Sequence, residues 1–369
     1  MTFNNEVIKN DEKAIFTLRS LYQKYGYKQY KMSKFEEYDL YARNKDFLVS
    51  DSVITFTDFG GKLLALKPDV TLSIIKNSQE GSLTKVYYNE NVYRAAEGSH
   101  SFKEIMQTGL ECIGDIDTYN ICEVIMLAIE SLSAISDDYV MDISHMGLIS
   151  GILTETTEDT LLQKKLLKCL GEKNIHEIKA ICREADTDST NLELLASIYG
   201  DGDKVTDALK KLSLSENTLK SLSELEDINR FLKENGLSGK VNFDFSIAGN
   251  MKYYSAVIFK GYIKGISSSV LSGGQYSKLL SRMGKKADAI GFAVYLDMLE
   301  RMNTRSKKYD VDTVLLYEEG ADASALYKNI KLLTDIGTTV LAVKDIPDIK
   351  YKQLLKFNGK GVEILENND

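Results

Sequence analysis

The pattern of hydrophobic and polar residues predicts mixed helices and strands in the first third of this 369-residue chain. Apolar residues recur at helical spacing over residues 11–25, and Gly26 then ends the predicted helix. A strand is predicted at residues 27–38, and short β-type runs separated by turn residues fill residues 47–114. An apolar helix follows from Tyr119 to Leu132. Helices and strands are therefore mixed in this part of the chain.

The pattern becomes helical from about residue 145 to residue 236. This block is rich in Leu, Lys and Glu, and no strand pattern interrupts it, so it predicts a helical insertion. Strand patterns return at 241–247, at 253–263 and around Val270–Leu271. The segment SGGQYSKLL (272–280) then predicts a glycine turn leading into a helix, and GFAVYLDMLERM (291–302) predicts a short strand running into a helix.

A charged segment, NTRSKK, predicts a linker after this core. Beyond it, VDTVLLY, a helical run at 322–336, TTVLAV, a second helical run at 349–358 and VEIL alternate as β-α-β-α-β. Such alternation predicts a small α/β unit with some parallel strand pairing. We therefore expect a core at 1–302, a linker at 303–310 and a C-terminal unit at 311–369.

Composition excludes several classes of function. The net charge of −8 and the presence of only eight arginines among 46 basic residues argue against a nucleic-acid binder. No stretch approaches the roughly 20 apolar residues of a membrane helix, and the polar N-terminal residues give no secretory signal. The four cysteines and three histidines lack metal-ligand spacing. We expect a cytoplasmic protein with free thiols and with no metal, cofactor, membrane or nucleic-acid partner.

The segment from Lys85 to Gly114 carries the most chemical information. Two β-type runs flank the polar loop AAEGSHS (95–101), which predicts a hairpin. Alternation in its second strand places Gln107, Gly109 and Glu111 on one face. A glycine between an amide and a carboxylate leaves room for a small polar ligand. From the pattern alone, a solvent-exposed strand face is the alternative.

Five segments of the chain resemble motifs of class II histidyl-tRNA synthetases, in the family's order. YRAAEGSHSFKEIMQTGLECIG resembles the second signature motif, and GFAVYLDML resembles the third motif, whose usual ending is GFALGLERL. The other three are LALKPDVTLSII, which resembles the LRPEGT segment; YYSAVIF, which resembles the histidine-recognising segment with paired tyrosines; and SGGQYSKLL, which resembles GGRYD. The resemblance covers about residues 10–302 and implies an α+β fold, with an antiparallel sheet flanked by helices and dimerisation through this core.

The resemblance also implies a retained amino-acid pocket. Asp69 stands where the family has a glutamate, and Thr71 matches the threonine that follows. Gln107 and Glu111 match residues that contact histidine, and Tyr253 and Tyr254 match the tyrosine pair at its imidazole. Taken alone, the two tyrosines are better explained by cross-strand packing. Carboxylates at Asp69 and Glu111 suit an α-ammonium group, and tyrosine hydroxyls suit ring nitrogens.

The arginines that handle ATP in this family are largely replaced. Arg94 remains, as a residue of a vestigial nucleotide site, while the other positions hold Met298, Gly249, Gln275 and Lys103, and Ser33 stands at the first motif's proline. Each lost charged contact costs roughly 10²–10³ in rate, so no catalytic residues are expected. The C-terminal segment resembles a shortened anticodon-binding domain without arginine, which is a poor tRNA binder.

These departures resemble a paralogous family, the ATP phosphoribosyltransferase regulatory subunits. That resemblance implies a non-catalytic partner of a short-form catalytic subunit, which it activates and through which histidine inhibits the first step of histidine biosynthesis. The implied assembly is a homodimer within a hetero-oligomer. Two alternatives remain open: a histidine–tRNA ligase with a divergent ATP site, and a non-catalytic protein that senses histidine or tRNA.

Overall fold

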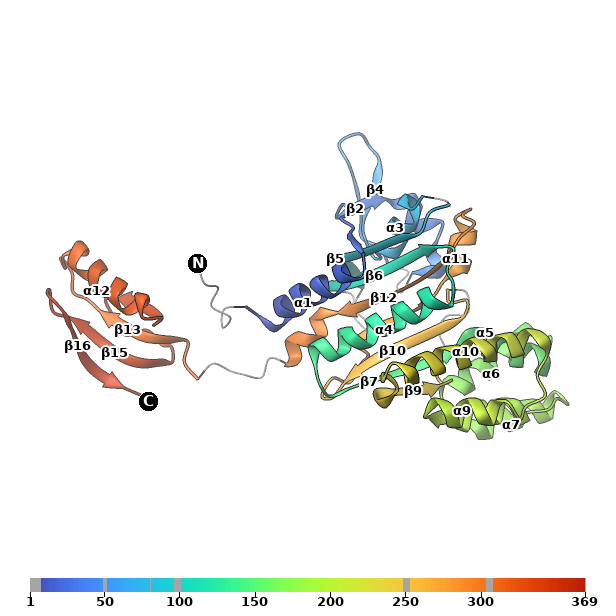
Figure 1. Cartoon of the computed structure of the whole chain (residues 1–369). Coiled ribbons are helices and arrows are strands. Elements are labelled where there is room, and N and C mark those ends of the chain that lie inside the picture. Colours follow the sequence, from blue (N-terminus) through green and yellow to red (C-terminus); the bar gives the residue numbers. More distant parts are fainter. Residues whose placement is uncertain are drawn as a thin grey trace. The chain divides into compact units, whose positions relative to one another are not determined.

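The chain divides into two compact units, residues 1–302 and residues 303–369 (Figure 1). The computed structural model describes residues 8–48, 52–79, 81–95, 101–247, 253–302 and 308–368. The first five residues of the predicted linker, 303–307, lie outside this description. The two units are treated separately below.

A nine-stranded sheet forms the centre of the first unit, in the order β1-β5-β6-β12-β11-β10-β7-β9-β8. Neighbouring strands are antiparallel except for the pairs β1–β5 and β7–β9. Together with the surrounding helices, this mixed architecture agrees with the predicted α+β class. The strands are β1 (Lys28–Gln29), β5 (Thr84–Ala95), β6 (Phe102–Gly114), β7 (Tyr139–His145), β8 (Tyr199–Gly200), β9 (Val241–Asp244), β10 (Val257–Ile263), β11 (Leu271–Gln275) and β12 (Asp288–Tyr295).

Two helices, α1 (Asn10–Lys24) and α4 (Thr118–Ile135), pack together on this sheet (Figure 1). Within the described residues, α4 is long and apolar enough by composition to cross a membrane, which corrects the expectation that no segment approaches this length. Its apolar residues instead pack into the core, with Val124, Ile125 and Leu132 buried. Burial on several sides of a core helix accounts for its composition.

The block predicted to be helical contains α5 (Met146–Thr156), α6 (Thr160–Gly171), α7 (Ile175–Glu184), α8 (Thr190–Ser197), α9 (Gly202–Leu209) and α10 (Glu216–Glu234). Polar residues cap five of these helices by accepting backbone hydrogen bonds, namely His145, Asp159, Asn174, Asp201 and Ser215. One expectation is wrong, because the two-residue strand β8 interrupts the block and pairs with β9. The strands on either side of the block, β7 and β9, are parallel neighbours.

A smaller three-stranded sheet, β2-β4-β3, lies before the hairpin. The predicted strand at 27–38 is instead divided between β1 and β2, with helix α2 beginning at Tyr38. The bounds here are β2 (Phe35–Glu37), α2 (Tyr38–Ala42), the 3-10 helix η1 (Lys45–Phe47), β3 (Thr55–Thr57), β4 (Leu63–Leu66) and α3 (Thr71–Asn77). Its apolar side forms a second core cluster with Tyr88 and Tyr276.

The glycine-containing segment SGGQ lies in strand β11 and not in a turn, so that prediction is wrong. A Cβ atom on Gly273 would lie 2.4 Å from the carbonyl oxygen of Gly291, so the glycine permits close contact between β11 and β12. Helix α11 (Ser277–Arg282) follows β11, and β12 runs into the 3-10 helix η3 (Leu296–Met302), as predicted. The remaining 3-10 helix is η2 (Ser238–Lys240).

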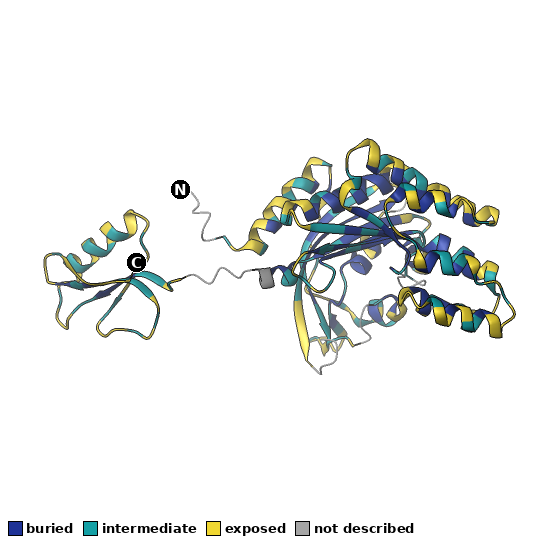
Figure 2. Ribbon diagram, turned by 90° about the horizontal axis from the view of Figure 1, so that it is seen from below, coloured by how far each residue is buried: buried dark blue, intermediate teal, exposed yellow. Residues whose placement is uncertain are grey.

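The second unit is a four-stranded sheet in the order β14-β13-β15-β16 with one helix. Parallel pairing of β13 with β14 and β15 confirms that prediction. The helix predicted at 349–358 is wrong, because this segment forms β15 and buries Leu354, Leu355 and Phe357. The elements are β13 (Val311–Leu316), α12 (Ala323–Asp335), β14 (Val340–Val343), β15 (Tyr351–Phe357) and β16 (Val362–Asn367). Figure 2 shows much less buried chain in this unit than in the first.

Candidate functional site

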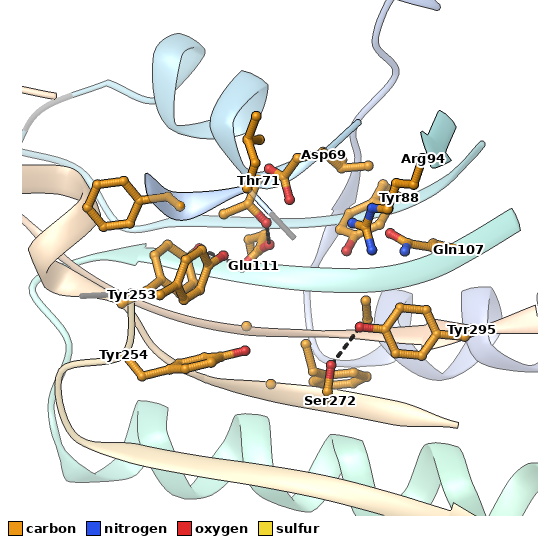
Figure 3. Close-up of a pocket in the computed structure, with 18 residues that line it drawn as sticks. Asp69, Thr71, Tyr88, Arg94, Gln107, Glu111, Tyr253, Tyr254, Ser272 and Tyr295 are labelled. Carbon is orange, nitrogen blue, oxygen red and sulfur yellow. Dashed lines mark hydrogen bonds between the residues drawn. The ribbon is translucent and has the colours of Figure 1, made fainter. Parts of the chain in front are cut away.

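A cavity of about 320 Å³ opens on one face of the large sheet. All seven residues that the sequence singled out line it: Asp69, Thr71, Arg94, Gln107, Glu111, Tyr253 and Tyr254 (Figure 3). They come from the hairpin β5–β6, from the segment entering α3 and from the segment before β10. The structure therefore brings the whole predicted set together.

Small residues on adjacent strands form the floor of the cavity. Three rows cross the sheet: Glu111 lies beside Gly291, Gly109 beside Ala293, and Gln107 beside Tyr295. Successive rows on one face of a sheet are about 7 Å apart. A Cβ atom on Gly291 would lie 1.7 Å from Glu111 Oε2, so the carboxylate occupies the space that a side chain would fill. Gly291 and Ala293 line the cavity from β12 with little or no side chain, whereas Glu111 and, above Gly109, Tyr88 occupy the space over β6.

Glu111 is buried at the first row, with 2 % of its surface exposed. Thr71 Oγ1 donates a hydrogen bond to Glu111 Oε1 over 2.7 Å, and the Tyr276 hydroxyl donates to Oε2. Burial raises the pKa of Glu111 to about 8, while the hydrogen bonds from Tyr276 and Thr71 act in the opposite direction. This carboxyl group is thus poised to exchange a proton near neutral pH.

Asp69 and Arg94 place opposite charges next to each other on the cavity wall. Asp69 Oδ1 accepts a hydrogen bond from the backbone N–H of Leu72 over 2.9 Å, at the first turn of α3. Burial raises the pKa of Asp69, and the positive charge of Arg94 opposes that shift. Arg94 is held in place because its Nε donates to the carbonyl oxygen of Pro68 over 2.7 Å.

Gln107 overturns the alternative of a solvent-exposed strand face. Its side chain lines the cavity and only 2 % of its surface is exposed. Its Nε2 is buried and has no hydrogen-bond partner among the described residues. A buried amide donor without a partner is unfavourable unless a ligand or water completes it.

The paired tyrosines both pack together and face the cavity. The ring centroids of Tyr253 and Tyr254 are 4.7 Å apart, and that of Tyr276 lies 5.8 Å from Tyr253. Burial raises the pKa of all three hydroxyl groups. At neutral pH they are therefore protonated and able to donate hydrogen bonds.

Sequence reasoning missed four further polar lining residues, Tyr88, Ser272, Tyr276 and Tyr295. Tyr276 lies within the SGGQYSKLL motif, so the motif itself carried a usable signal. Ser272 and Tyr295 join each other through a hydroxyl–hydroxyl hydrogen bond of 2.7 Å. That contact depends on strand register, which the sequence alone does not supply.

The substituted arginine positions are used for packing or face away from the cavity. Met298 packs against the apolar core, where its sulfur accepts a hydrogen bond from Ser268. Gln275 Oε1 accepts the backbone N–H of Val257 over 3.1 Å, and Lys103 is exposed on β6. Gly249 lies outside the described residues. Of the described residues that line the cavity, Arg94 alone is a cation. No group of three or more His, Cys, Asp or Glu side chains in the described parts of the chain is placed to hold a metal.

Comparison with known proteins shows the family. The model of the histidyl-tRNA synthetase family matches residues 4–299. A protein named ATP phosphoribosyltransferase regulatory subunit, from Caldanaerobacter subterraneus subsp. tengcongensis, is 30% identical over 303 residues, which cover 79% of this chain and 78% of that protein. This chain belongs to the family of ATP phosphoribosyltransferase regulatory subunits. Another regulatory subunit, from Acetivibrio thermocellus, is 28% identical over 82% of this chain and 75% of its own length.

Solved structures share the fold of this regulatory subunit. One is a crystal structure from Bacillus halodurans, described as an ATP phosphoribosyltransferase regulatory subunit/histidyl-tRNA synthetase. The match has a TM-score of 0.73 and 23% identity, and it covers 96% of this chain and 96% of that chain. A chain of the ATP phosphoribosyl transferase (HisG:HisZ) complex from Thermotoga maritima matches with a TM-score of 0.63 and 23% identity, over 78% of this chain and 97% of that chain. The predicted family and its synthetase-like fold are both confirmed.

Proposed function

We propose that this chain is a non-catalytic subunit that assembles with a short-form ATP phosphoribosyltransferase, activates it and transmits feedback inhibition by histidine. Family membership supports the regulatory role in histidine biosynthesis. The observation that supports histidine as the ligand is the cavity, which has an oppositely charged pair at its wall and a buried carboxyl group among tyrosines. These features are complementary to a zwitterion with a polar ring.

The head group of a free amino acid fits the charged pair. Asp69 is placed to accept an α-ammonium group, and Arg94 is placed to bind the neighbouring α-carboxylate. The unpaired Nε2 of Gln107 supplies a further donor toward the same head group. Binding would thereby satisfy a buried group that is otherwise left without a partner.

The imidazole of histidine fits the opposite side of the cavity. Glu111 and the hydroxyl of Tyr254 face this space, and the ring has one nitrogen donor and one acceptor when neutral. Because the pKa of Glu111 is about 8, the group is able both to donate a proton to a ring nitrogen and to accept one from it. A cavity of about 320 Å³ is at the small end of the range for ligand sites, which suits a single amino acid.

The absence of catalysis is part of the proposal. Adenylate formation needs several preorganised positive charges at the phosphates. The described cavity lining supplies Arg94, and the side chain of Met298 packs into the core. Loss of one such contact costs roughly 10²–10³ in rate, so several losses make efficient activation of histidine improbable.

Feedback inhibition requires that histidine bind two states of the assembled complex with different affinities. We place this coupling in a hetero-oligomer in which two copies of this chain pair through the synthetase-like core. The cytoplasm, where amino acids are made, is the proposed compartment.

The direct test is reconstitution with the catalytic subunit. Its phosphoribosyltransferase activity is measured alone, with this chain, and with this chain plus histidine. We expect activation by the chain and inhibition by histidine. If the rate with this chain equals the rate of the catalytic subunit alone, the chain is not an activator.

Variants locate the effector site in the same assay. Glu111→Ala and Tyr254→Phe should each weaken histidine inhibition at least tenfold while activation persists. Tyr327→Phe, at an exposed tyrosine of the second unit, is the matched control and should leave inhibition unchanged. Normal inhibition in both pocket variants would place the effector site elsewhere.

Two alternatives have separate signatures. A histidine–tRNA ligase would catalyse histidine-dependent exchange between ATP and pyrophosphate, followed by tRNA charging. A histidine- or tRNA-sensing protein without a phosphoribosyltransferase partner would bind its ligand but fail to form the complex in a co-purification experiment.

A further inference from the structure

We infer that Tyr295 is the specificity-determining end wall of the pocket, which admits free histidine and excludes histidine derivatives enlarged at the carboxyl group. The excluded class includes esters and, above all, acyl nucleotides. This inference rests on the proposed function, because it concerns the ligand of the same site.

Strand register places Tyr295 at the end of the small-residue floor. The first row pairs Glu111 with Gly291, the second pairs Gly109 with Ala293, and only the third carries large side chains on both strands. On β12, the cavity-lining positions therefore change from small residues, Gly291 and Ala293, to the large side chain of Tyr295 at the third row. A glycine in place of Tyr295 would extend the hollow by one row, about 7 Å.

Several contacts hold the tyrosine ring across the pocket. The backbone N–H of Tyr295 donates to the carbonyl oxygen of Val270 over 2.8 Å, and its hydroxyl shares the 2.7 Å hydrogen bond with Ser272 on β11. Burial raises the pKa of Tyr88 and of Tyr254, and the nearby Tyr295 hydroxyl adds to both shifts. Tyr295 is thus held at its backbone and at its hydroxyl group.

The wall stands at the carboxylate side of the proposed ligand. Figure 3 shows Tyr295 on the same side of the pocket as Arg94 and Gln107, away from Tyr253 and Tyr254. The free carboxylate of a bound histidine would lie beside Arg94. A group joined to that carboxylate would have to extend into the space that Tyr295 occupies. Alignment with the motif ending GFALGLERL puts Tyr295 at the position of a glycine, so this chain has a large side chain where that motif has none.

The test compares the wild type with Tyr295→Gly and Tyr295→Phe by calorimetric titration. The ligands are histidine, histidine benzyl ester and a non-hydrolysable sulfamoyl analogue of histidyl-adenylate. We expect the wild type and Tyr295→Phe to bind histidine and to reject both larger ligands, because the ring remains. Tyr295→Gly should bind the two larger ligands at least tenfold more tightly than the wild type, with histidine affinity changed less than about threefold.

Two results would overturn the inference: tight binding of the analogue by the wild type, or no gain in a Tyr295→Gly variant that still binds histidine. Tyr295→Ala serves as a second opening variant if glycine prevents folding, which thermal unfolding reports. If no variant binds histidine, the proposed ligand is wrong. In that case the role of Tyr295 as an end wall is tested by titration with AMP alone. The inference then requires that Tyr295→Gly bind AMP at least tenfold more tightly than the wild type does.

Discussion

One ion pair in each unit of this chain shows how differently the units surround charged side chains. In the first unit, Lys67 is 1% exposed and pairs with Glu90, which is 16% exposed. In the second unit, Lys356 pairs with Glu318 at exposures of 43% and 77%. Strand β16 is exposed along its whole length, and α12 has no buried residue. The same chemical pair is therefore enclosed in one unit and solvated in the other.

This difference indicates where the sequence is constrained. A buried polar group is costly unless its partner is present, so each one limits substitution of its neighbours. A solvated group exchanges its partner for water at little cost. The first unit can form a selective pocket from a few buried groups, whereas the second tolerates change at most of its charged positions.

The ion pairs provide the largest contrast. Lys67→Met should lower the free energy of unfolding by about 4 kcal/mol, because it leaves the Glu90 carboxylate enclosed without its cation. Lys356→Met is the matched control and should leave the urea midpoint unchanged. Urea denaturation followed by circular dichroism measures both. Equal losses in the two variants would break the comparison.

The carboxyl groups differ in the sign of their pH dependence. The pKa of Glu111 is raised from 4.5 to about 8, so the folded state holds a proton that the unfolded state releases. Its contribution to stability is complete below about pH 4.5 and is lost as pH rises through about 8. Glu111→Gln should remove this decline and gain about 4 kcal/mol relative to the wild type between pH 5 and pH 9.

Glu318 is the control for that measurement. Its hydrogen bond from Lys356 lowers the pKa of this carboxyl group, so its contribution is lost as pH falls. Glu318→Gln should therefore show no gain at pH 9. A rise in both variants would mean that Glu111 is not the group responsible.

One glycine in each unit shows how the two units differ in the space around the backbone. Gly291→Ala should destabilise the chain by about 2 kcal/mol and abolish histidine binding, because the new Cβ atom overlaps the Glu111 carboxylate. At Gly361, in the second unit, a Cβ atom meets nothing within 4 Å. Gly361→Ala should therefore change stability by less than about 0.5 kcal/mol. Thermal unfolding and calorimetric titration report the two effects.

The smallest predicted effect concerns one charged contact of the ligand. Arg94→Gln should weaken histidine binding about tenfold, because a solvent-accessible guanidinium–carboxylate contact contributes roughly 1–2 kcal/mol. Histamine lacks the carboxylate, so its affinity should not change. Lys344→Gln in the second unit is the control. A parallel loss of both ligands would show that Arg94 supports the pocket without binding the carboxylate.

The sequence predicts some of the residues that line the pocket and does not predict others. Alternation in β6 was enough to place Gln107 and Glu111 on one face, since side chains alternate strictly along a strand. Tyr295 and Ser272 escaped notice because their contact depends on the register between β11 and β12. The apolar positions of residues 349–358 do not separate a helix from a strand, and pairing of Leu355 with Leu315 on β13 makes this segment a strand.

The parallel pairing of β7 with β9 has a consequence for the evolution and engineering of this core. Two parallel neighbours cannot be joined by a tight turn, so a path of at least a dozen residues must return from one end of the sheet to the other. Residues 146–240 are that return path. The six helices are therefore replaceable, provided that the replacement still reaches from one end of the sheet to the other. A deletion joining His145 directly to Val241 would remove β9 from the sheet, whereas replacement by a shorter crossover would keep it.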